Sequence, residues 1–128
     1  MNIVVRQQLN MLVQLARADE NFAEIEKETI LRIARANNFP ESELRKLILN
    51  PEPIGSFGAL SLNQKFEYLY NSVDLMMVDD SIHNSEKLFC MNIAIKLGFK
   101  KDVIDFLIKE IKPKRKETLK DIVFAKYT

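Results

Sequence analysis

Two short acidic segments of the chain contain the residue types that bind a cation. The first runs from Asp19 to Glu26 and the second from Asp79 to Glu86. In both, an aspartate is followed three residues later by an apolar side chain and seven residues later by a glutamate. Carboxylate oxygens are the ligands that hard cations such as Ca²⁺ and Mg²⁺ prefer. The pattern therefore predicts a set of candidate metal ligands. They are Asp19, Glu26, Asp79 and Glu86, with Glu20 and Asp80 as weaker candidates.

The spacing matches only the second half of an EF-hand calcium loop. A complete loop also needs carboxylates at its first and third positions. In the first segment those positions fall on Leu15 and Arg17, and in the second they fall on Leu75 and Met77. None of these side chains is a carboxylate, so the sequence excludes an EF-hand.

The same carboxylates also have a purely structural interpretation. Each aspartate can accept backbone N–H groups at the start of the helix that follows it, and each glutamate falls in the first turn of that helix. Both placements suit the positive end of a helix dipole. Helix capping and divalent-metal binding are therefore two competing interpretations of the acidic segments.

Both segments belong to an internal repeat with an offset of 60 residues. Residues 11–50 match residues 71–110 at ten positions without a gap, whereas composition alone would give about two or three matches. The identical pairs are Val13/Val73, Leu15/Leu75, Asp19/Asp79, Glu26/Glu86, Lys27/Lys87, Ile33/Ile93, Ala34/Ala94, Phe39/Phe99, Leu47/Leu107 and Ile48/Ile108. Asn38 aligns with Gly98, and these two residue types most readily adopt the left-handed conformation that ends a helix.

Apolar residues at helical spacing predict three helices in each half of the repeat, and no stretch shows the alternation of a strand. The segment 50–60, with two prolines and two glycines, is the predicted linker. Ser61 and Gln64 then form a capping box at the start of the second half. The chain is therefore predicted to be an all-α, single-domain bundle (residues 1–128) of about seven helices. Its two three-helix units, about 5–50 and 61–111, are related by a pseudo-twofold and are followed by a C-terminal helix.

Composition places the chain among ordinary globular proteins. Of its 128 residues, 47% are hydrophobic and 29% are charged, which is typical of a folded domain. No apolar run approaches the roughly 18 residues of a membrane span, and the first residues lack the pattern of a signal peptide. A single cysteine excludes an intrachain disulfide. These features predict a cytoplasmic protein.

The two acidic segments and the stretches that follow them resemble the TerB-like family of tellurite-resistance proteins. That domain type also occurs on the N-terminal side of some J-domain co-chaperones. The family turn reads approximately Ala-Asp-Gly, any residue, Ile or Val, three residues, Glu. Matching residues are Ala18, Asp19, Phe22 and Glu26 in the first copy and Asp79, Ile82 and Glu86 in the second. Glu20 and Asp80 replace the family glycines, and Val78 stands where alanine is usual.

The resemblance covers residues of about 5 to 110. It implies a seven-helix bundle, a role in stress response and a divalent metal, Ca²⁺ or Mg²⁺, bound by the clustered acidic residues.

The sequence disfavours an enzyme. Cys90 and His83 are the candidate nucleophile and base, but no third orienting group or oxyanion motif accompanies them. Cys90 is interpreted as a small buried hydrophobic residue and His83 as an exposed turn residue. No glycine-rich phosphate loop and no nucleophile elbow are present.

Charge is distributed unevenly along the chain. Residues 87–128 contain 11 Lys+Arg and 5 Asp+Glu, a balance of +6, and residues 1–86 contain 8 and 13, a balance of −5. Residues 109–120 are the densest basic run, and no aromatic residue alternates with its cations as base stacking would require. The leading hypothesis is a non-enzymatic TerB-like module that binds a partner protein, with or without a divalent ion. The alternative is the binding of an anionic surface or nucleic acid by residues 100–120.

Overall fold

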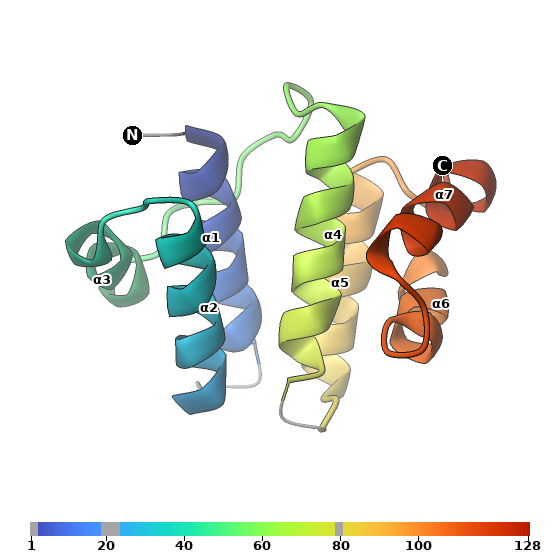
Figure 1. Ribbon diagram of the computed structural model, residues 1–128. Helices are drawn as coiled ribbons and strands as arrows, with labels where there is room; N and C mark the ends of the chain where they lie inside the picture. Colours follow the sequence, from blue (N-terminus) through green and yellow to red (C-terminus); the bar gives the residue numbers. More distant parts are fainter. Residues whose placement is uncertain (1–2, 19–23, 79–80) are drawn as a thin grey trace.

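The regular secondary structure is entirely helical. The computed structural model describes residues 3–18, 24–78 and 81–128, and within these ranges the chain forms seven α-helices and no strand (Figure 1). The helices are α1 (Ile3–Ala16), α2 (Glu24–Ala36), α3 (Glu41–Leu49), α4 (Leu62–Met76), α5 (Asn84–Lys96), α6 (Val103–Glu110) and α7 (Lys116–Lys126). The prediction of an all-α bundle of about seven helices is confirmed.

Local sequence signals account for several helix ends. At the start of α4 the Gln64 backbone N–H donates to Ser61 Oγ at 3.1 Å, and the Ser61 N–H donates to Gln64 Oε1 at 2.8 Å. This pair is the predicted capping box, which satisfies backbone donors that the helix itself leaves unbonded. At the start of α3, Pro40 has an extended backbone conformation and leaves no N–H to satisfy.

The ends of α2 and α5 repeat the same turn. Asn38 and Gly98 both have positive φ angles, of 57° and 92°. In each turn the following phenylalanine donates its backbone N–H to an alanine carbonyl, from Phe39 to Ala34 and from Phe99 to Ala94, both at 2.9 Å. The left-handed residue reverses the chain and lets the next N–H bond back to a helix carbonyl. The alignment of asparagine with glycine is thus explained by a shared backbone conformation.

The packing of the helices follows the repeat. The central helices α1 and α4 pack against each other, and each packs on the second and third helix of its own half. Contacts between the halves are also paired, since α1 touches α5 and α2 touches α4. Exchanging α1–α3 with α4–α6 leaves this pattern unchanged, as a pseudo-twofold relation requires. In Figure 1, α1 and α4 run in the same direction, so equivalent ends of the two halves lie at the same end of the bundle.

Most of the apolar residues repeated between the halves lie in the core. Five of the identical pairs have both members buried and apolar, and a sixth, Phe39/Phe99, is buried just beyond α2 and α5. The five pairs are Val13/Val73, Leu15/Leu75, Ile33/Ile93, Ala34/Ala94 and Leu47/Leu107. Burial of apolar area is the main favourable contribution to folding, so the repeat marks the positions on which the bundle depends.

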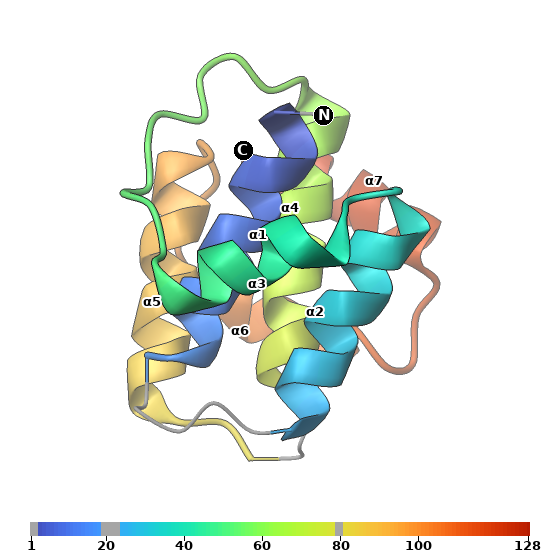
Figure 2. The ribbon, with the colours of Figure 1, turned by 90° about the vertical axis from the view of Figure 1, so that its left-hand side faces the viewer.

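The segments that follow the two halves occupy equivalent faces of α1 and α4. After α3, the predicted linker runs without helix to the start of α4 (Figure 2). The linker residue Glu52 pairs with Arg6 and exchanges backbone–side-chain hydrogen bonds with Asn10, at 2.7 and 2.9 Å. After α6, α7 reaches the matching positions 66 and 70 of α4.

There, Phe124 packs edge-on against Phe66 with ring centroids 6.0 Å apart, and Lys116 Nζ lies 4.8 Å from the Tyr70 ring centre. Equivalent positions of α1 and α4 thus anchor the linker and α7, respectively.

None of the helices in the described ranges combines the length and the apolar character needed to cross a membrane.

Candidate functional site

The acidic end of the bundle contains two of the predicted metal ligands. Glu26 lies in the first turn of α2 and Glu86 in the first turn of α5. The beginnings of these helices lie at the same end of the molecule (Figure 1). Both side chains are buried, with exposed fractions of 3% and 2%. The remaining candidates, Asp19, Glu20, Asp79 and Asp80, lie outside the described residues.

Burial of these glutamates is unusual for their residue type. A carboxylate is rarely taken out of water unless it has hydrogen-bond or charge partners, and both Glu26 and Glu86 have such partners. The positive end of the helix dipole favours a carboxylate at the start of a helix. Their oxygen donors also suit a hard cation, although the described residues by themselves contain no group of three or more potential metal ligands. Both interpretations of the acidic turns involve these two buried side chains.

Cys90 and His83 lie in different environments in this structure. The Cys90 side chain is completely buried on α5, and its thiol lies 3.8 Å from the Ser72 carbonyl oxygen as a weak donor. Burial and, to a smaller extent, the charge of Glu86 raise the pKa of the Cys90 thiol. His83 is exposed immediately before α5. A thiol that stays protonated and out of contact with water is a poor nucleophile.

We expect Cys90 to be chemically inert in the folded protein. An aromatic disulfide reagent at neutral pH should label it at least about a hundredfold more slowly than the denatured chain, because labelling needs an opening of the structure. The measurement is the absorbance of the released thiolate, with and without guanidinium chloride. Rapid labelling in native buffer would contradict the structure and return Cys90 to the list of candidate nucleophiles.

The basic segment 100–120 has carboxylate partners within the molecule. Lys114 pairs with Glu110 at 3.2 Å, Lys116 with Glu67 at 2.7 Å and Lys120 with Glu117 at 3.3 Å. These contacts reduce the positive charge that the segment offers to a polyanion. The binding of nucleic acid or an anionic surface stays a prediction, and no contact in the described part of the chain favours it.

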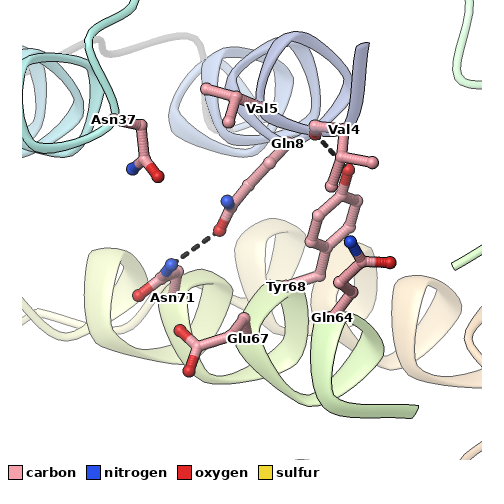
Figure 3. Close-up of a pocket in the computed structure, with 8 residues that line it drawn as sticks. All are labelled: Val4, Val5, Gln8, Asn37, Gln64, Glu67, Tyr68 and Asn71. Carbon is pink, nitrogen blue, oxygen red and sulfur yellow. Dashed lines mark hydrogen bonds between the residues drawn. The ribbon is translucent and has the colours of Figure 1, made fainter. Parts of the chain in front are cut away.

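A polar cavity between α1, α4 and the end of α2 was missed by the sequence analysis (Figure 3). It has a volume of about 300 Å³. Its walls are Val4, Val5, Gln8, Asn37, Gln64, Glu67, Tyr68 and Asn71. Tyr68 donates its hydroxyl to the Val4 carbonyl, and Asn71 Nδ2 donates to Gln8 Oε1 at 2.6 Å. These polar groups bond to one another, so they join α1 to α4.

The outer face of α5 was also missed. Leu88 and Ile95 are exposed, at 59% and 55%, and Met91 lies half-buried between them. A hollow of about 350 Å³ lies against Met91, Leu88 and the neighbouring Lys87 and Asn84. We call Leu88, Met91 and Ile95 the α5 stripe.

The repeat contains a signal that identifies the α5 stripe. The α2 residues aligned with Leu88 and Ile95 are Glu28 and Arg35, and the one aligned with Met91 is Leu31. Glu28 and Arg35 are exposed on α2. The two equivalent outer positions are therefore charged on α2 and aliphatic on α5. The two halves thus share their core but differ in the character of these exposed positions.

Comparison with models of known protein families, with curated proteins and with solved structures finds no match to this chain. The TerB-like resemblance therefore depends on the residues of the two turns and the helices after them.

Proposed function

We propose that this chain is a non-enzymatic, TerB-like helical module that binds a partner protein through the α5 stripe, in a stress-response setting as the resemblance implies. The observation that carries the proposal is the exposure of Leu88 and Ile95 at positions where the first half has Glu28 and Arg35. The buried positions of the two helices serve the same core in both halves. Packing within the chain therefore gives no reason for aliphatic side chains at 88 and 95.

The free energy that favours binding at this face comes from removing apolar surface from water. Two large aliphatic side chains and a methionine on one helix face leave apolar area in solvent, and covering it with a partner recovers about 25 cal/mol per Å² before the costs of association. Such patches mark interaction sites more often than isolated exposed residues do. A charged pair, as on α2, would keep this face solvated, so the α5 stripe is the surface by which the second half differs functionally from the first.

A site-specific photo-crosslinker tests this proposal. It is placed at Asn92, beside the α5 stripe, and in a control protein at Arg32, the equivalent position on α2. We expect a discrete crosslinked protein from host cells at position 92 and none at position 32. The double variant L88E/I95R, which gives α5 the charges of α2, should abolish the product. A crosslink that persists in that variant, or equal crosslinking at both positions, would contradict the proposal.

A divalent ion at the acidic end is a second candidate function, supported by the two buried glutamates at equivalent positions. In this version an ion bound by Glu26 and Glu86, with Asp19 and Asp79, organises the end of the bundle. Calorimetric titration with Ca²⁺ and Mg²⁺ tests it, with Asp19→Asn and Asp79→Asn as variants that should lose the heat. No heat from the unmodified protein would leave the carboxylates as helix caps.

A further inference from the structure

The polar cavity between α1, α4 and the end of α2 has room for a small molecule. Its volume of about 300 Å³ is the space of roughly ten water molecules and lies at the lower end of the range for ligand pockets. Half of its wall residues carry side-chain amides, namely Gln8, Asn37, Gln64 and Asn71. Each amide offers an NH₂ donor and a carbonyl acceptor, so the walls can form hydrogen bonds in both directions.

Gln8 is the most deeply buried of these amides, with an exposed fraction of 7%. Its side chain extends from α1 towards Asn71 of α4 (Figure 3), and the single bond between the two amides runs from Asn71 Nδ2 to Gln8 Oε1 at 2.6 Å. Within residues 3–18, 24–78 and 81–128, Gln8 Nε2 and Asn71 Oδ1 have no other hydrogen-bond partner. One bond between two amides leaves a donor on one and an acceptor on the other, whichever way they are turned. Buried polar atoms of this kind are stabilised by water or by a ligand.

The walls favour an uncharged ligand over an ion. Glu67 is the one charged residue among them, and its Oε2 accepts a hydrogen bond from Lys116 Nζ at 2.7 Å. Lys116 is not a wall residue, so the Glu67 charge is balanced from outside the cavity. An ion of either sign would lose its hydration without meeting an unpaired opposite charge in the walls, which is unfavourable.

The two asparagines of the cavity lie where the other half of the repeat has apolar residues. At the offset of 60 residues, Asn37 aligns with Leu97 and Asn71 aligns with Met11. Leu97 and Met11 are buried, with exposed fractions of 2% and 0%. Replacing the asparagines by the aligned residues should therefore fill the cavity with side chains that this fold already accommodates at equivalent positions.

We propose that the cavity binds a small uncharged polyol or sugar, whose hydroxyl groups form hydrogen bonds with Gln8, Asn37 and Asn71. A hydroxyl group both donates and accepts, so it suits amides that offer a donor on one side and an acceptor on the other. Val4 and Val5 complete the wall on α1 and suit the C–H groups of such a molecule. The site shares no residue with the α5 stripe and goes beyond the proposed function.

Nuclear magnetic resonance on the ¹⁵N-labelled full chain tests the proposal at pH 6. Glucose, mannitol and myo-inositol are the neutral probes, and glucosamine, which is protonated at this pH, and glucuronate are charged relatives of similar size. At least one neutral probe should shift the side-chain NH₂ signals of Gln8 and Asn71 saturably, with a dissociation constant in the millimolar range that is expected for so small a ligand. The two charged relatives should bind about tenfold or more weakly than that neutral probe.

Variants that fill the cavity provide the second part of the test. Asn37→Leu and Asn71→Met, checked for folding by circular dichroism, should each abolish the saturable shift of the Gln8 NH₂ signal. Asn63→Met is the matched control, since Asn63 is exposed on α4 outside the cavity walls, and it should bind like the unmodified protein. The proposal is overturned if none of the three neutral probes gives a saturable shift, if a charged relative binds more tightly, or if binding persists in both cavity variants.

Discussion

Replacement of Glu86 by alanine is expected to lower the free energy of unfolding by about 2–4 kcal/mol, and Glu26→Ala should have a similar effect. Each carboxylate is buried in the first turn of its helix. Its removal takes away a favourable interaction with the positive helix end and the hydrogen-bond or charge interaction that the buried carboxylate makes, and the loss of such interactions at buried polar groups is expensive. Denaturant unfolding followed by circular dichroism measures the change.

Glu24→Ala is the control for this prediction. Glu24 shares the first turn of α2 with Glu26 but is exposed. Its replacement should therefore lower the free energy of unfolding by at most about 1 kcal/mol. A cost below about 1 kcal/mol for Glu86→Ala would show that burial of this carboxylate does not matter for stability.

The double variant distinguishes helix capping from metal binding. If Glu26 and Glu86 are separate caps, their destabilisations add to within about 0.5 kcal/mol, and Ca²⁺ or Mg²⁺ leaves the thermal midpoint of the unmodified protein unchanged. If they hold one ion, the effects are strongly non-additive, and the ion raises the midpoint of the unmodified protein by mass action. The size-matched variants Glu26→Gln and Glu86→Gln should then lose that increase while keeping the shape of the side chain.

Phe66→Ala is expected to be the most destabilising of the substitutions considered, at about 3–5 kcal/mol. The Phe66 ring is completely buried on α4 and contacts Phe124 of α7 and the ring of Tyr70. Its loss leaves a cavity at the place where α7 joins the bundle. Thermal unfolding should show a midpoint lower by roughly 10–20 °C.

Two comparisons make the Phe66 prediction specific. Leu62→Ala on the same helix, at a residue that is 50% exposed, should cost less than about 0.5 kcal/mol. A double-mutant cycle with Phe124→Ala should give a coupling energy of about 0.5–1.5 kcal/mol, the range for an edge-on aromatic pair. Additive effects of the two phenylalanines would mean that α7 does not depend on this contact.

Helix class, helix number and the main turns followed from local chemistry. The capping box at Ser61 and Gln64 is a local hydrogen-bond arrangement, and Asn38 and Gly98 are residues that tolerate positive φ, so neighbouring residues were enough to predict them. The repeat also allowed core positions to be predicted, because identical apolar residues in two copies mark equivalent buried positions. The same alignment singled out Glu26 and Glu86 together, but it did not reveal that both are buried, since burial depends on helices that lie far away in sequence.

Other features were decided by tertiary packing. Periodicity distinguishes the buried face of a helix from its outer face only when the outer face is polar. Both faces of α5 carry apolar residues: Cys90 and Ile93 are buried, and Leu88 and Ile95 are exposed. The polar cavity combines side chains of α1 and α4 with Asn37 of the turn after α2, and no short window of sequence contains them. The equivalence of the linker and α7, which have no sequence in common, arises because α1 and α4 present the same face to whatever follows them. The amino-acid sequence by itself therefore determined the helical repeat and its turns, where interactions are local, while the assembled bundle determined which carboxylates are buried and which apolar side chains are exposed to solvent.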